Sequence, residues 1–177
     1  CLLGSINLSK MVSEDGEFNI DEFKNTVRIA TIGLNEVLEE GIQYLPLPEQ
    51  RDSVTKWRQI GLGVMGIADM LIKMGLTYGS EESIDFCSKI ARIMLNECVK
   101  TSAMIAKEKG PYPGYDRNAV MSTKFYIENL DDDIKKLVEE YGLRNSQGLS
   151  IAPTGSLSTM LGISGFFVFL FANYYER

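Results

Sequence analysis

The segment Gly61-Leu62-Gly63-Val64-Met65-Gly66, between Trp57-Arg58-Gln59-Ile60 and Ile67-Ala68-Asp69, restricts the fold more than any other stretch. It fits the dinucleotide-binding pattern G-x-G-x-x-G, which works only where a buried strand precedes it and a helix opens within it. The preceding residues are polar and do not form a buried strand. An acidic residue should follow about 20 residues on, but Glu81 and Glu82 lie in the expected first turn of a helix. The pattern therefore favours close packing of a strand against a helix over nucleotide binding.

The rest of the sequence predicts helices with a few short strands. Strand-like stretches cover residues 1–8 and 149–152. Helices with Ser, Asn or Asp at the start and Gly near the end are expected over 20–41, 80–110 and 131–141, with a shorter one ending at Gly75. Residues 51–60 are polar and 111–130 are expected to form a loop. This order of elements predicts an α/β fold with helix in excess.

The helix over 80–110 carries two of the three cysteines. Its expected apolar stripe consists of Ile84, Cys87, Ala91, Met94, Cys98 and Ile105. Cys87 and Cys98 are 11 residues apart, about 16 Å along a helix, which is too far for a disulfide between them. Because both lie on the stripe, we expect buried thiols.

The composition excludes several classes of protein. The 177 residues include 18 Lys and Arg, 24 Asp and Glu, three Cys and no His, with a net charge of −6. The length suits a single unit, 1–177. The acidic balance argues against nucleic-acid binding, and no run of about 18 apolar residues predicts a membrane span. Without His there is no imidazole base and no metal site is expected. Three cysteines are few for a protein held together by disulfides, which favours a reducing cytoplasmic location.

Both ends suggest a piece of a longer polypeptide. Cys1 is not Met, and the last residues, Phe169–Arg177, stop without a helix cap. We therefore expect a fragment.

The segment Ser150–Ser158 is a candidate anion site. Hydroxyls at Thr154, Ser156 and Ser158 are expected where a strand-like stretch becomes a helix, beside backbone N–H groups that lack intrahelical partners. Gly155 would allow a ligand to approach the backbone closely. An ordinary Ser/Thr helix cap explains the same pattern, and the sequence leaves both interpretations open.

Several segments, in the same order, resemble the catalytic subunit of ribonucleotide reductase. They are Cys1–Leu8, Trp57–Asp69, Ala106–Gly110, Tyr141–Ser146 and Ser150–Ser158. The Ala-Pro-Thr-Gly-Ser sequence in the last of them is most similar to the adenosylcobalamin-dependent class II members. The resemblance thus implies adenosylcobalamin as the cofactor of the parent enzyme.

The resemblance implies a helix-rich portion of a ten-stranded α/β barrel that begins just after the finger loop. In the family, a thiyl radical on a finger-loop Cys removes the ribose 3′ hydrogen. The 2′ hydroxyl then leaves as water, and a Cys pair is oxidised to a disulfide. Cys1 matches one member of that pair. The other member and the radical-bearing Asn-x-Cys-x-Glu constellation are expected upstream.

The same resemblance assigns roles to residues 151–156. It implies that Pro153, Thr154, Gly155 and Ser156 hold the phosphates of a nucleoside di- or triphosphate, with Ile151 and Ala152 near the ribose. The expected partners are the rest of the catalytic subunit and a second copy of it.

The chain departs from the family pattern at Phe166-Phe167-Val168-Phe169, where the family has a Gly, an apolar residue and Glu-Pro. The apolar run Phe166–Ala172 is therefore expected to be buried against a second copy or to promote aggregation.

Two functions are compatible with the sequence. The first is part of a ribonucleotide reductase that makes deoxyribonucleotides for DNA synthesis and is inactive as an isolated fragment. The alternative is a non-catalytic helical protein, derived from the family, that binds phosphate ligands or other proteins.

Overall fold

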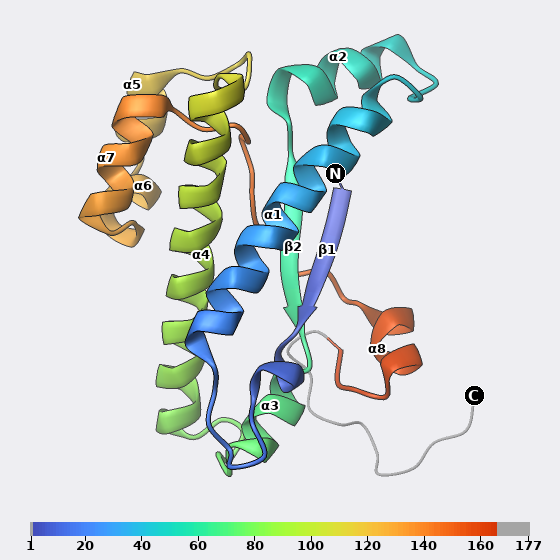
Figure 1. The fold of residues 1–177 in the computed structure, drawn as a ribbon, viewed down its shortest axis with the longest axis vertical. Helices are drawn as coiled ribbons and strands as arrows, with labels where there is room; N and C mark the ends of the chain where they lie inside the picture. Colours follow the sequence, from blue (N-terminus) through green and yellow to red (C-terminus); the bar gives the residue numbers. More distant parts are fainter. Residues whose placement is uncertain (1, 166–177) are drawn as a thin grey trace.

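Two parallel strands, β1 (Leu2–Asn7) and β2 (Ile60–Met65), form the sheet at the centre of a computed structural model that describes residues 2–165 (Figure 1). Leu2 pairs with Ile60, and Asn7 pairs with Met65. The 147–150 segment runs along the other edge of β2. There the backbone N–H groups of Ile60 and Leu62 donate to the carbonyls of Gln147 and Gly148, and Ser150 N–H donates to the carbonyl of Leu62.

The predicted strand over 149–152 is reduced to one parallel bridge between Leu149 and Leu62. A Cβ atom at Gly63 would lie 2.4 Å from the Ser150 carbonyl oxygen. Because a Cβ atom points away from the plane of a sheet, the Ser150 carbonyl oxygen lies over the face of β2, although the Ser150 N–H still bonds to the edge of β2. The chain thus leaves the edge of β2 before a third strand can form.

The glycine-rich segment is strand β2 itself, and every residue of β2 is buried. Gly66 follows with a φ of 73° and starts helix α3 (Ile67–Lys73). A Cβ atom there would also lie 2.9 Å from Asn7 Oδ1, so glycine is required both by the backbone angle and by the space. The segment is thus a strand that turns into a helix, but close packing against a helix is not what requires its glycines: Gly63 lies against the backbone of Ser150 and Gly66 against Asn7.

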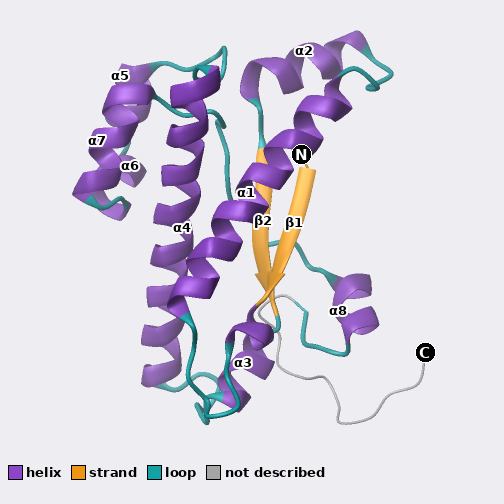
Figure 2. Cartoon of the chain, viewed as in Figure 1, coloured by secondary structure: helices purple, strands orange, loops and turns teal. Residues whose placement is uncertain are grey.

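Helices α1 (Ile20–Ile42) and α4 (Glu81–Lys109) pack against each other, and α1 covers one face of the sheet (Figure 2). As predicted, Asn19 caps α1 by accepting from Glu22 N–H at 2.9 Å, and Ser80 caps α4 by accepting from Ser83 N–H at 3.3 Å. Gly110 ends α4.

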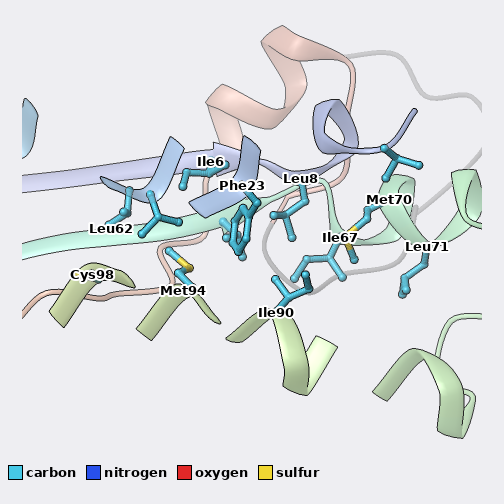
Figure 3. Close-up of a cluster of buried hydrophobic side chains, with 13 residues drawn as sticks. Ile6, Leu8, Phe23, Leu62, Ile67, Met70, Leu71, Ile90, Met94 and Cys98 are labelled. Atoms are coloured by element: carbon cyan, nitrogen blue, oxygen red, sulfur yellow. The ribbon is translucent and has the colours of Figure 1, made fainter. Parts of the chain in front are cut away.

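The main core lies between α1, α3, α4 and the sheet (Figure 3). Phe23 and Val27 of α1 are fully buried, and Leu62 of β2 and Met94 of α4 are nearly so. Burial of each such side chain stabilises the fold by about 1.5–3 kcal/mol.

The predicted stripe of α4 is only partly correct. Met94 and Cys98 are buried, whereas Ile84 is 57% exposed. Ile90, one residue from the predicted Ala91, is buried instead. The hydrophobicity of the residues along α4 identifies the apolar side of the helix but not which edge of that side faces α1. The predicted stripe was therefore displaced around the helix from the buried one.

The helices that the sequence did not predict are short or polar. Helix α2 (Pro48–Trp57) has no buried residue. Its sequence shows no apolar periodicity, and Pro48 in its first turn was the only residue that indicated the start of a helix. Helices α5 (Arg117–Met121) and α6 (Lys124–Asn129) occupy the expected loop. They precede the predicted helix α7 (Asp132–Tyr141), which packs on α4.

A buried polar network joins α1 to the residues that lead into the 147–150 segment. The Asn35 amide donates to Asn145 Oδ1 at 3.1 Å, and the Asn145 amide donates back to Asn35 Oδ1 at 2.9 Å. Arg58, which is buried, donates to Glu39 at 2.6 Å. These bonds pair the amide groups of both Asn side chains and one nitrogen of the Arg58 guanidinium, whereas Arg58 Nε is buried without a partner.

Within the described part of the chain, no helix combines the length and apolar character needed to cross a membrane. The prediction for Phe166–Ala172 lies outside the described residues.

Candidate functional site

The candidate site lies at the carboxyl end of the parallel sheet. β1 ends at Asn7 and β2 at Met65, and the segment beside β2 leads into Pro153 (Figure 1). In α/β folds, ligands bind beyond the carboxyl ends of the strands. The sheet therefore places residues 151–156 in a position suited to ligand binding.

Thr154 has an unusual backbone conformation at this position. It precedes helix α8 (Gly155–Leu161) with a φ of 51° and a ψ of 26°, and its side chain makes no capping hydrogen bond. A β-branched residue with a positive φ is uncommon, and such strain costs roughly 1–3 kcal/mol and gathers at ligand sites. Thr154 therefore does not cap α8 through its side chain.

Gly155 and Ser156 face open surroundings, whereas Ser158 does not. A Cβ atom at Gly155 would meet no atom within 4 Å, and Ser156 is exposed. Ser158 is buried, and its hydroxyl donates to the Gly155 carbonyl at 3.2 Å. The structure thus separates the buried Ser158 from the exposed Gly155 and Ser156, and Thr154 is half-buried.

Ile151 and Ala152 are half-buried. The Ile151 side chain packs against the main core, which anchors the segment next to β2. Pro153 is exposed, so the chain emerges from the core just before Thr154.

Sequence reasoning did not single out Asn7, Asp69 or Ser164, which also lie at this end of the sheet. Asn7 Oδ1 accepts from the backbone N–H of Ser9 at 3.0 Å and from its hydroxyl at 2.8 Å. Asp69 Oδ2 accepts from the backbone N–H of Ser164 at 2.7 Å and from its hydroxyl at 2.6 Å. Asp69 follows the glycine-rich segment by three residues, but an acidic residue in the first turn of a helix is too common to have identified it.

The cysteines are distributed over the chain. Cys1 lies outside the described residues, and Leu2 after it pairs with Ile60 at the amino end of the sheet. Cys87 and Cys98 are free thiols on α4, as predicted; Cys98 is buried, whereas Cys87 is only half-buried. Burial raises the pKa of both thiols, that of Cys98 to about 11. Both thiols are thus mainly protonated near neutral pH, which slows their reactions.

Thiol labelling should separate the three cysteines. We expect Cys1, the candidate redox thiol, to react first, Cys87 more slowly, and Cys98 only on unfolding, because the thiolate is the reactive form. Peptide mass spectrometry after timed treatment of the folded chain with iodoacetamide measures the three rates. Equal rates would contradict the burial of Cys98, and labelling in urea provides the control for intrinsic reactivity.

The described residues contain no cluster of metal ligands. No group of three or more Cys, Asp or Glu side chains among them could hold a metal ion. A cavity of about 460 Å³ lies between α4 and residues 143–149, and no charged side chain lines it.

Comparison with known proteins identifies the family of this chain. The family model described as "Ribonucleotide reductase, barrel domain" matches residues 1–177. The chain is 34% identical over its full length to a vitamin B12-dependent ribonucleoside-diphosphate reductase of Thermoplasma acidophilum, of which it covers 21%. It is 30% identical, over 93% of its length, to the ribonucleoside-diphosphate reductase subunit alpha of Chlamydia muridarum, of which it covers 17%.

The chain spans about a fifth of the length of these relatives. The helix-rich structure with a small parallel sheet is consistent with a portion of an α/β barrel. Since the family model covers the whole chain, this protein belongs to the ribonucleotide reductase barrel-domain family.

Proposed function

We propose that the chain is part of the catalytic barrel of a ribonucleotide reductase, and that residues 153–156 hold the phosphates of its nucleotide substrate. The observation that carries this proposal is the turn at Thr154, strained and without a side-chain cap, at the carboxyl end of a parallel sheet. The names of the relatives support a ribonucleoside diphosphate as the substrate and a vitamin B12-dependent parent enzyme.

The phosphate contacts would come from the backbone and from hydroxyl groups. The first N–H groups of a helix have no partner within it, which leaves those of Gly155 and Ser156 for phosphate oxygens. The open space at Gly155 lets a phosphate approach the backbone, and the hydroxyls of Thr154 and Ser156 would donate further hydrogen bonds. Ile151 and Ala152, which precede the turn, would lie near the ribose.

The reduction itself needs two thiols. Cys1 would supply one, and the other would come from outside this chain. The two thiols give up two hydrogen atoms and form a disulfide, while the ribose 2′ hydroxyl leaves as water and a hydrogen takes its place at C2′. The thiyl radical that starts the reaction also comes from outside the chain and is regenerated at the end.

The test replaces the two hydroxyls in a full-length subunit that carries these residues. Thr154→Val keeps the β-branched shape, and Ser156→Ala removes only the hydroxyl oxygen. Each lost hydrogen bond to a charged phosphate costs about 1.5–3 kcal/mol, so we expect KM to rise by about tenfold or more per site, with kcat little changed. Steady-state kinetics with a ribonucleoside diphosphate measures both constants.

Glycine replacements provide the matched control. Gly155→Ala places a methyl group where the phosphate would approach, and should also raise KM. Gly33→Ala introduces the same methyl group in α1, where nothing lies within 4 Å, and should leave KM unchanged. An unchanged KM in all three site variants would refute the phosphate site. Phosphate-dependent nucleotide binding without any reduction by the full-length subunit would favour the non-catalytic alternative.

A further inference from the structure

Asp69 holds Ser164 across 95 residues of sequence. One carboxylate oxygen, Oδ2, accepts from the Ser164 backbone N–H at 2.7 Å and from its hydroxyl at 2.6 Å. The Ser164 carbonyl in turn accepts from Gly66 N–H at 2.8 Å. All three hydrogen-bonding groups of Ser164 are thus bound by Gly66 and by Asp69 in the first turn of α3, and Ser164 is 5% exposed.

Ser164 belongs to a turn, residues 162–165, that is packed on the candidate phosphate segment. The Ile163 N–H donates to the Ser158 carbonyl at 3.0 Å, and Ser158 N–H donates to the Thr154 carbonyl at 2.8 Å. A Cβ atom at Gly165 would lie 3.2 Å from the Pro153 carbonyl oxygen. The contacts therefore form a continuous path from Asp69 to Pro153 and Thr154.

Within the described residues, helix α8 has little support from apolar packing. Its three large apolar side chains are more than half exposed in this chain: Leu157 at 52%, Met160 at 81% and Leu161 at 55%. A short helix gains most of its stability from contacts with the rest of the protein, and the contacts that this chain supplies to α8 are chiefly the polar ones at its two ends. Asp69 supplies two of those contacts at the carboxyl end.

We propose that Asp69 is a positioning residue, which fixes turn 162–165 and through it holds Pro153–Ser156 in the geometry that binds phosphate. This inference rests on the proposed phosphate site and adds a residue to it. Asp69 acts through Ser164 and does not contact the nucleotide. Its replacement should therefore affect the phosphate-bearing part of the ligand more than the nucleoside part.

The test compares variants of the full-length subunit that carries these residues. Asp69→Ala removes both hydrogen bonds, Asp69→Asn keeps an oxygen that can accept them, and Ser164→Ala removes only the hydroxyl bond. Asp133→Ala is the control, because Asp133 is also an acid in the first turn of a helix but is exposed. Kd is measured by calorimetry for a ribonucleoside diphosphate and for the same nucleoside without phosphates.

Asp69→Ala is expected to weaken binding of the diphosphate by about tenfold or more, and that of the nucleoside by less than about twofold. Asp69→Asn should recover most of the loss, Ser164→Ala should show a smaller loss, and Asp133→Ala should show none. Equal weakening for diphosphate and nucleoside would overturn the proposal, as would an Asn variant no better than Ala.

Hydrogen–deuterium exchange without nucleotide gives a second readout. Asp69→Ala should increase exchange over 155–165 and leave α1 unchanged, which also shows that the fold is intact. Unchanged exchange over 155–165 would overturn the proposal. If Thr154→Val does not weaken diphosphate binding, the phosphate site itself fails. If Thr154→Val weakens binding and Asp69→Ala does not, only the positioning role fails.

Discussion

The purified 177-residue chain is expected to convert no ribonucleotide to deoxyribonucleotide, with or without added adenosylcobalamin. The proposed chemistry needs a radical-bearing thiol and two reducing thiols. The chain has three cysteines, but Cys98 is buried with its pKa raised to about 11, and the pKa of Cys87 is also raised by burial. The two lie on one helix, about 16 Å apart along its axis, and cannot form a reducing pair. Only Cys1 remains as a candidate.

The measurement is deoxynucleotide formation from a radiolabelled ribonucleoside diphosphate in the presence of a dithiol reductant. A full-length subunit that carries these residues, assayed in parallel, shows that the conditions support turnover. Deoxynucleotide produced by the purified chain would contradict the assignment of the missing thiols to other parts of the enzyme. A Cys1→Ser variant of the full-length subunit should lose multiple turnover, because a serine hydroxyl cannot form a disulfide.

Gly63→Ala is expected to destabilise the barrel and to reduce activity strongly. The added Cβ atom would lie 2.4 Å from the Ser150 carbonyl oxygen and 3.4 Å from Ile151 Cα. Backbone atoms cannot move aside as a flexible side chain can, so the 150–152 segment must shift. Overpacking of this kind costs about 1–3 kcal/mol, and sometimes more. A shift of about 1 Å at a substrate-positioning segment can reduce the rate roughly a hundredfold.

Urea unfolding and kcat/KM of the full-length subunit test this expectation. Gly33→Ala is the control for stability, since its methyl group meets no neighbour and alanine favours a helix over glycine by about 1 kcal/mol. Wild-type stability and kcat/KM in the Gly63→Ala variant would show that Ser150 does not lie against β2 as described. Loss of stability in both variants would point to a general intolerance of the fold rather than to this contact.

The sequence predicted the elements whose signals are local. Asn19 and Ser80 cap their helices, and Gly110 and Gly142 end theirs, because capping depends on residues within one turn of each other. The glycine-rich segment was likewise predicted from its own residues, and it forms a strand that turns into a helix. Helix α2 was not predicted because Val54 and Trp57 are its only apolar residues apart from Pro48, too few to form a periodic pattern.

Contacts between residues distant in sequence were decided only by the tertiary structure. Hydrophobicity did not show which edge of α4 faces α1, so Ile84 was assigned to the core although it is exposed. The requirement for glycine at position 63 becomes clear only once Ser150 lies over β2.

In the candidate site too, some features follow from the local sequence and others only from the tertiary structure. The residue types at 153–156 indicated an anion site or a helix cap, and the unusual φ of Thr154 without a side-chain cap was needed to favour the first. Asp69 and Ser164 gave no sequence signal as a pair, since 95 residues separate them. Local patterns determine capping and strand or helix preference over a few residues, whereas the packing of distant segments depends on the free energy of the whole fold.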